Sequence, residues 1–211
     1  MPPRVRFPFL LLFTCACSTA VAPGLDSDAS ISVDAVAADG SVISDAPLDV
    51  PNADAPVLNF ALKSDDTSEG ATLAKEFTCD ATPAASMVSP SLRWTHGPAG
   101  TKSYAVVFND TSISFLHGAI YDVAGTKLTK GIERTYEPLD PSGAKQTKAY
   151  DGKFGYAGPC PTGEHIYEFV LYALDVANVP DVTKDSTTKT VETELKKHAL
   201  ARTKLTVKYA R

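Results

Sequence analysis

The sequence predicts a mainly β domain with a single helix near its C-terminal end. Short stretches rich in β-branched and aromatic residues recur at residues 60–62, 91–94, 104–108, 116–123, 166–174 and 205–209. The segments between them are dense in Gly, Pro, Asp and Thr, which is typical of turns and loops that join strands. Loops of this kind on a β scaffold commonly carry the functional site.

One helix is expected over residues 188–201. Val191, Leu195, Ala199 and Leu200 fall on one face at helical spacing, and lysines occupy much of the opposite face. Residues 57–211 are long enough to form one domain that buries about two-thirds of its unfolded surface.

The first 17 residues have the features of an export signal. Arg4 and Arg6 precede a short apolar run over residues 7–13, which small residues follow. This run falls well short of the roughly 18 to 20 apolar residues that a membrane span needs. We therefore expect residues 1–17 to direct export rather than to span a membrane.

A cysteine directly after the apolar run also resembles the lipobox of bacterial lipoproteins. Cys17 follows the small residue Ala16, which favours Cys17 as the acylated residue of a lipoprotein-type signal segment. Cys15 is the competing acylation site. Cleavage of an ordinary secretory signal near Ala20 is the alternative to both.

Residues 18–56 have a composition that cannot form a core. This segment holds seven aspartates, no Glu, no basic residue and no aromatic residue, so we expect a disordered acidic tether of Asp, Ala, Ser and Pro. This segment contains seven of the 25 acidic residues, and the signal segment contains two of the 20 basic residues. Residues 57–211 therefore contain 18 acidic and 18 basic residues. The domain lacks the basic field on which nucleic-acid binding depends.

Two histidines and one aspartate are the candidate functional residues. His117 and His165 each adjoin an apolar strand, and Asp110 ends another, so the three could meet at one rim of a sheet. Such a set suits a small anion or a metal ion. The sequence has no G-x-S-x-G, HExxH, CxxC pair, P-loop or GxGxxG motif. We therefore predict a binding protein, not an enzyme, without catalytic residues, bound metal or cofactor.

Several ordered blocks resemble the bacterial branch of the phosphatidylethanolamine-binding protein (PEBP) family, also called Raf kinase inhibitor-like proteins. They cover nearly all of residues 57–211. In chain order they are residues 77–80 (FTCD), 89–94 (SPSLRW), 100–105 (GTKSYA), 109–110 (ND), His117, 155–161 (GYAGPCP), 165–167 (HIY) and 171–175 (LYALD).

This resemblance implies both a fold and a site. The fold would be a PEBP-like domain with a large central antiparallel sheet, a smaller packed sheet and a C-terminal helix. A small pocket at one end of the sheet would accept phosphate-like anions through imidazole, phenol and backbone N–H donors, with Asp110 orienting a histidine. By position, the pocket residues would be Asp110, His117, Gly158, Pro159, His165 and Tyr167.

Three departures from the family pattern concern the mouth of this pocket. Residues 111–114 (TSIS) replace Pro-Asp-Ala-Pro, Gly118 replaces a Trp, and Ile166 replaces an Arg. A carboxylate, an aromatic wall and a cation would be missing. We expect either a ligand that differs from the family's usual one or a degenerate site.

The resulting hypothesis is an exported, lipid-anchored protein of the bacterial cell envelope, on the periplasmic or outer side of a membrane. Its partner would be a small anion or a phospholipid headgroup. One alternative is an inhibitor that acts through its surface on a peptidase or kinase-like enzyme. A weaker alternative is a metal-dependent enzyme that uses His117, His165 and Asp110.

Cleavage of the signal determines which of the four cysteines remain in the mature protein. If Cys17 is acylated, Cys15 leaves with the signal, and Cys79 and Cys160 remain in an oxidising compartment. We predict that they form a disulfide, and two buried free thiols are the alternative. The bond would close a loop of roughly 80 residues and stabilise the domain by about 3 to 4 kcal/mol in the chain-entropy model.

Overall fold

The computed structural model describes residues 59–83 and 86–211. The expected signal segment with Cys15 and Cys17, and the expected tether over residues 18–56, lie outside the described residues. Within the described ranges, no helix has the length and apolar character needed to cross a membrane.

The domain is built on a five-stranded antiparallel sheet with the strand order β6-β4-β3-β7-β8. The bounds are β3 Ser103–Asp110, β4 Phe115–Val123, β6 Lys145–Gln146, β7 His165–Leu174 and β8 Ala199–Tyr209. A three-stranded antiparallel sheet has the order β1-β2-β5, with β1 Leu62–Lys63, β2 Leu92–Trp94 and β5 Lys127–Leu128. The helices are η1 Lys75–Phe77 and α1 Thr188–Lys197.

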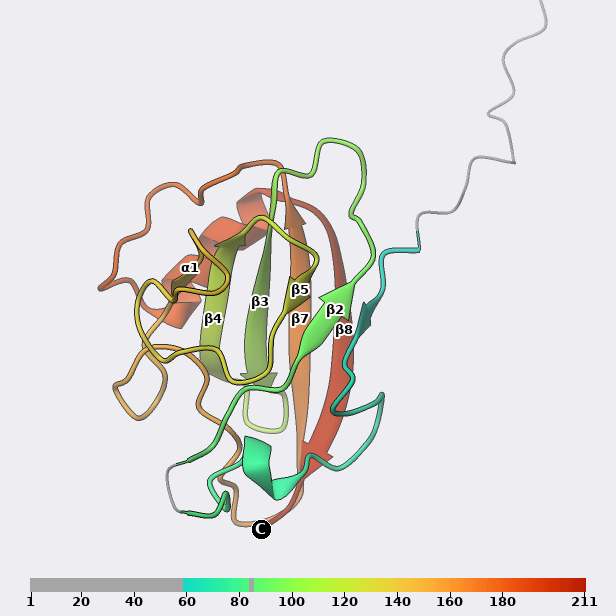
Figure 1. The fold of residues 1–211 in the computed structure, drawn as a ribbon, viewed down its shortest axis with the longest axis vertical. Coiled ribbons are helices and arrows are strands. Elements are labelled where there is room, and N and C mark those ends of the chain that lie inside the picture. The colour runs from blue at the N-terminus through green and yellow to red at the C-terminus, as the bar shows by residue number, and fades with distance from the viewer. Residues whose placement is uncertain (1–58, 84–85) are drawn as a thin grey trace, which may run out of the picture. The chain divides into compact units, whose positions relative to one another are not determined.

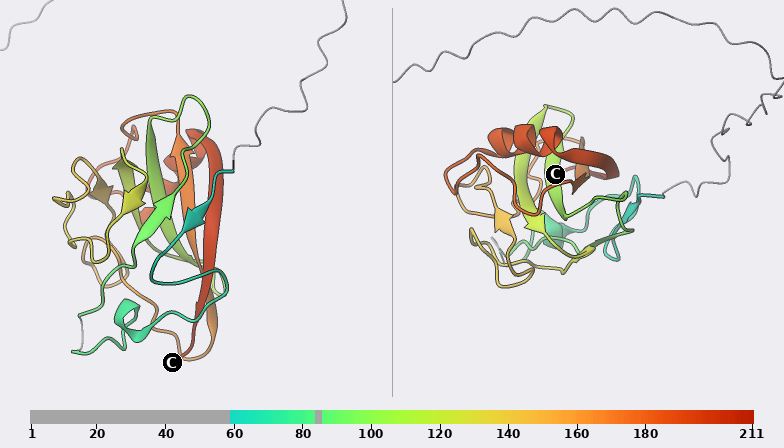
Figure 2. Two further views of the ribbon diagram at one scale, coloured as in Figure 1. Left: turned by 45° about the vertical axis from the view of Figure 1, so that its right-hand side comes forward. Right: turned by 90° about the horizontal axis from the view of Figure 1, so that it is seen from above.

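The elements form three layers. The small sheet lies over one face of the large sheet (Figure 1), and α1 covers the opposite face (Figure 2). The predicted mainly β fold, with a large sheet, a smaller packed sheet and a C-terminal helix, is confirmed.

Alternation along the strands divides the core into two parts. On β3, Tyr104, Val106 and Phe108 pack toward the small sheet, whereas Ala105 and Val107 pack toward α1. The side under the small sheet holds most of the buried aromatic rings. The candidate site lies at the end of this aromatic layer.

The predicted helix was too long at its C-terminal end. α1 ends at Lys197, and Ala199, the first residue of β8, pairs with Leu174 of β7. Ala199 and Leu200 therefore belong to a strand. The ladder of ten residue pairs between β8 and β7 outweighs the preference of these two residues for helix, because tertiary pairing commonly overrides local propensity.

Candidate ligand site

Two rows of core side chains continue into the site. On β3, Phe108 is followed on the same face by Asp110, and on β7, Phe169 is followed by Tyr167 and then His165. Phe108 pairs with Phe169, and Asp110 pairs with Tyr167. Period-two geometry thus places a carboxylate, a phenol and an imidazole at the end of the aromatic layer.

His117 reaches the same place through a β-bulge. Gly118 pairs with Phe108 and Leu116 with Asn109, so His117 is an extra residue on β4. Strict alternation would put His117 on the face with Ala119, which packs in the core under α1. The bulge turns its ring to the other face, where its centroid lies 5.0 Å from that of Phe108.

Asp110 and His165 form a directly hydrogen-bonded pair. The Nδ1 atom of His165 lies 2.7 Å from Oδ2 of Asp110, and the backbone N–H of Ser112 donates to Oδ1 over 3.0 Å. Asp110 is only 2% exposed, so these donors satisfy a carboxylate that has lost most of its water. The pair fixes the ring of His165 and compensates its charge when the ring is doubly protonated.

His117 is held differently. Its Nδ1 lies 3.0 Å from the carbonyl oxygen of Ala157, and the residue is 5% exposed. Burial lowers the pKa of His117 because it disfavours the charged ring; positive charge on His165 also lowers it, whereas the Ala157 carbonyl and Asp110 oppose these effects. His117 is therefore a neutral imidazole at neutral pH.

The four polar side chains Asp110, His117, His165 and Tyr167 surround a cavity of about 250 Å³. Its lining is completed by Ile113, Phe115, Tyr150, Cys160 and Pro161. Burial and the neighbouring Asp110 raise the pKa of Tyr167, so its phenol stays protonated. The lining contains no Lys or Arg.

Two aromatic rings, which no sequence pattern predicted, form a wall of this cavity. The ring centroids of Phe115 and Tyr150 lie 5.2 and 5.3 Å from that of His117, both in edge-to-face geometry. They supply the aromatic surface expected to be missing at Gly118. Phe115 could have been found from its position two residues before His117, but Tyr150 lies in a loop without a sequence signal.

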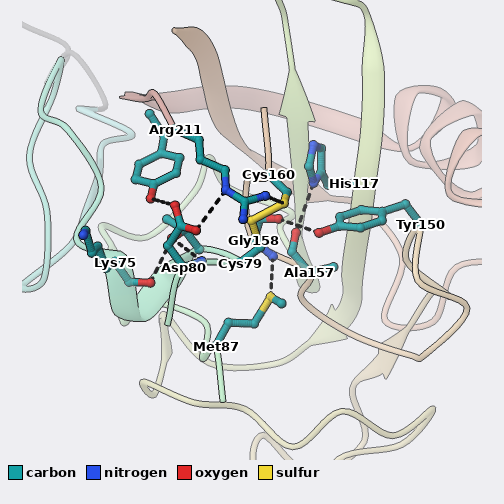
Figure 3. The surroundings of a disulfide bond; sticks show 12 residues. Lys75, Cys79, Asp80, Met87, His117, Tyr150, Ala157, Gly158, Cys160 and Arg211 are labelled. Carbon is teal, nitrogen blue, oxygen red and sulfur yellow. Dashed lines mark hydrogen bonds and ion pairs between the residues drawn. A yellow bond between two sulfur atoms is a disulfide. The ribbon is translucent and has the colours of Figure 1, made fainter. Parts of the chain in front are cut away.

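Gly158 and Pro159 lie beside the cavity but do not line it. The N–H of Gly158 donates to the sulfur of Met87 over 3.2 Å, and its carbonyl oxygen accepts from the Tyr150 hydroxyl over 2.9 Å (Figure 3). The carbonyl oxygen of Pro159 accepts from the N–H of Cys79 over 3.0 Å. The N–H of Gly158, which was expected to bind an anion, is already used to hold the loop.

The predicted disulfide between Cys79 and Cys160 is confirmed. It joins the segment after η1 to the loop beside the cavity (Figure 3), and Cys160 itself lines the cavity. A Cβ on Gly158 would overlap the carbonyl oxygen of Phe77. The two segments are therefore both covalently linked and packed in direct backbone contact.

The residues that depart from the family pattern fit together locally. The N–H of Ile166 donates to Oγ of Ser112 over 2.9 Å, and the N–H of Thr111 donates to the carbonyl oxygen of Ile166 over the same distance. A Cβ on Gly118 would lie 3.2 Å from the carbonyl oxygen of Gly155, so a larger side chain would require the neighbouring loop to shift. These contacts keep the ends of β3 and β7 together at the mouth.

The arrangement does not match a metal site. Across residues 59–83 and 86–211, no three His, Cys, Asp or Glu side chains are grouped so that they could hold a metal ion. Both oxygens of Asp110 and Nδ1 of each cavity histidine have hydrogen-bond partners within the protein. The set Asp110, His117 and His165, considered for a metal-dependent enzyme, does not present three convergent ligands.

Comparisons with known proteins identify relatives of the whole domain. Residues 63–210 match the family model described as phosphatidylethanolamine-binding protein. A UPF0098 protein of Methanothermobacter thermautotrophicus is 30% identical over 156 residues, which cover 71% of this chain and 98% of that protein. The putative lipoprotein LppC of Mycobacterium tuberculosis is 33% identical over 113 residues, covering 52% of this chain and 53% of its own length.

A solved structure agrees with this relationship. The crystal structure of Escherichia coli YbcL, described as a member of the mammalian PEBP family, superimposes with a TM-score of 0.63 at 27% identity. The superposition covers 72% of this chain and 98% of YbcL.

Proposed function

The chain belongs to the phosphatidylethanolamine-binding protein family, and we propose that it is an envelope-anchored binding protein whose cavity takes a phosphate-like anion. The observation that carries the proposal is the Asp110–His165 pair beside His117 in a cavity of about 250 Å³. This volume suits a small headgroup-sized ligand rather than a large substrate.

The charge of the site supports a specific role for His165. With no Lys or Arg in the lining, imidazole is the source of positive charge available to an anion. His117 is kept neutral by burial, whereas His165 has Asp110 as a counter-charge. The doubly protonated ring of His165 would donate from Nε2 to the anion, and the hydroxyl of Tyr167 is a second donor.

Membrane attachment is supported by the sequence and by one relative. The expected acylation site Cys17 lies outside the described residues, and the relative LppC is named a putative lipoprotein. An acidic tether gains nothing from an anionic membrane surface, so acyl chains must hold the protein there. Replacing Cys17 with Ser should release the chain from membranes; release by Cys15→Ser alone would assign the anchor to Cys15.

Titration calorimetry with inorganic phosphate and with O-phosphorylethanolamine tests the cavity. His165→Ala and His117→Ala should each weaken binding by about ten- to a hundredfold, since each removes a hydrogen bond to a charged ligand. Affinity should fall as pH rises from about 5.5 to 8 if positive charge on an imidazole contributes to binding.

His198→Ala is the matched control. The Nδ1 of His198 lies 2.9 Å from Oδ1 of Asp175, which repeats the histidine–aspartate pair away from the cavity. Binding should be unchanged in this variant. Equal affinity in the wild type and in both cavity variants would place the ligand elsewhere and reject the proposed function.

A further inference from the structure

The surroundings of His117 fix its tautomer. Its Nδ1 lies 3.0 Å from the carbonyl oxygen of Ala157, and a carbonyl oxygen can only accept a hydrogen bond. Nδ1 therefore carries the ring hydrogen. In the neutral ring the second nitrogen, Nε2, then has a lone pair and no hydrogen.

Nε2 of His117 is the ring atom that a ligand can reach. No described residue hydrogen-bonds to Nε2. In the described ranges, the fully buried side-chain polar atoms without a partner belong to Thr67, Trp94 and Thr135. Nε2 of His117 is not among them, so it is not fully buried. It therefore borders the open space of the cavity that His117 lines. The cavity wall thus includes a hydrogen-bond acceptor.

The groups that face the ring favour its neutral form. Burial lowers the pKa of His117, and charge on His165 of β7 acts in the same direction. Asp110 of β3 acts in the opposite direction, but each of its oxygens already accepts a hydrogen bond. Tyr167 of β7 and Tyr150 of the β6–β7 loop have raised pKa values because of burial, so both phenols are uncharged.

We propose that His117 makes the cavity selective for tetrahedral anions that carry a hydrogen. The inference rests on the proposed function, because it concerns the ligand of the same cavity. Inorganic phosphate keeps a P–O–H group at neutral pH and can donate it to Nε2 of His117. Sulfate has the same shape but no hydrogen, so its oxygen would face a lone pair. A site built to bind a hydroxyl rejects the analogue without it.

The same rule separates two sources of phosphate. A phosphate monoester carries a hydrogen in its monoanionic form, since its second pKa is about 6. A phosphodiester, the form of phosphate in the headgroup of an intact phospholipid, has none at neutral pH. At pH 7 only about a tenth of the monoester is in this monoanionic form. His117 therefore assigns the cavity to free phosphate first, then to the monoanionic form of a monoester, rather than to the diester headgroup.

Titration calorimetry on the full chain tests this selectivity with four probes: inorganic phosphate, sulfate, O-phosphorylethanolamine and glycerophosphorylethanolamine. At a pH of about 7, phosphate should bind about ten- to a hundredfold more tightly than sulfate, which corresponds to one hydrogen bond to a charged group. The monoester should exceed the diester by a smaller factor, because only about a tenth of it carries a hydrogen at this pH. As the pH falls and His117 gains its second hydrogen, Nε2 becomes a donor. The ratio of the affinity for phosphate to the affinity for sulfate should therefore fall.

The variant His117→Gln supplies an amide N–H that can donate near the position of Nε2. Its phosphate-to-sulfate ratio should fall toward one, whereas His198→Gln should keep the wild-type ratio. Equal binding of phosphate and sulfate by the wild type, or a ratio that neither low pH nor His117→Gln changes, would overturn the inference and leave the proposed function standing. Absence of binding by all four probes would instead reject the proposed function.

Discussion

The ligand site has one half carried by strands and one half carried by the loop between β6 and β7. Asp110, His165 and Tyr167 belong to β3 and β7, which pair continuously from one end to the other. Tyr150 and Ala157 belong to the loop, which is held by single hydrogen bonds and by the disulfide. The strands supply most of the polar side chains of the site, and the loop determines which ring nitrogen of His117 carries the hydrogen.

His117 depends on both halves. The bulge in β4 aims its ring at the cavity, and the carbonyl oxygen of Ala157 in the loop fixes its tautomer. Disturbing the loop should therefore change the chemistry of a residue that lies on a strand. Four changes test this division of roles.

Removing the disulfide should have the largest effect on the loop half. The bond closes a separation of 81 residues, so Cys79→Ser with Cys160→Ser should lower the free energy of unfolding by about 3 to 4 kcal/mol. Denaturant unfolding measures this difference, and wild type unfolded in dithiothreitol is the control. A loss below about 1 kcal/mol would show that packing alone holds the loop.

Filling the contact at Gly158 should come next. A Cβ there would overlap backbone atoms of Phe77 that cannot move aside cheaply, so Gly158→Ala should cost about 2 to 3 kcal/mol. Gly163 in the same loop has open space around the Cβ position, and Gly163→Ala should stay within about 0.5 kcal/mol. Similar stabilities for both variants would contradict the close approach of the two segments.

A smaller effect is expected from Tyr150→Phe. The change removes the hydrogen bond from the phenol to the carbonyl oxygen of Gly158 but keeps the ring that packs against His117. Unfolding should cost about 1 kcal/mol less, while phosphate affinity should change little. Tyr150→Ala should weaken phosphate binding, and unchanged affinity in that variant would remove Tyr150 from the wall of the site.

The pH dependence of stability should show the smallest effect. Because burial lowers the pKa of His117 below the ordinary histidine value of about 6.5, the unfolded chain binds a proton there at a higher pH than the folded chain does. The free energy of unfolding should therefore keep this contribution above pH 6.5 and lose it as pH falls through the lowered pKa. Thermal unfolding of His117→Gln should show a flatter profile in this window, and a profile parallel to that of wild type would be inconsistent with a buried neutral ring.

The strand half of the site could be predicted from the sequence because its signals are local. Asp110 ends an apolar run and His165 begins one, so their places at a rim followed from where the strands end. Family resemblance added Tyr167, and the Cys79–Cys160 disulfide followed from the compartment that the signal implied.

The loop half could not be predicted in the same way. Tyr150 joins the site only because residues 124–164 fold back between β4 and β7. This segment contains only the two-residue strands β5 and β6, and no periodicity encodes its path. The bulge at His117 depends on pairing with β3, which is a tertiary property. The amide expected at Gly158 was taken up by Met87, a contact between segments far apart in the sequence.

The short strands were missed for a related reason. β5 and β6 have two residues each, which is too short for alternation to be recognised. They exist because a neighbouring strand offers a partner, as Gln146 pairs with Ile120 of β4.

Nitrogen-15 NMR of the imidazole rings during a titration with inorganic phosphate tests the central claim most directly. The Nε2 resonances of His117 and His165 should shift together to saturation, and the Nδ1 of His117 should remain protonated. The rings of His198 and of the remaining histidine, His96, do not line the cavity and should not respond. Saturable binding that leaves the signals of His117 and His165 unmoved would contradict the assignment of the cavity as the ligand site.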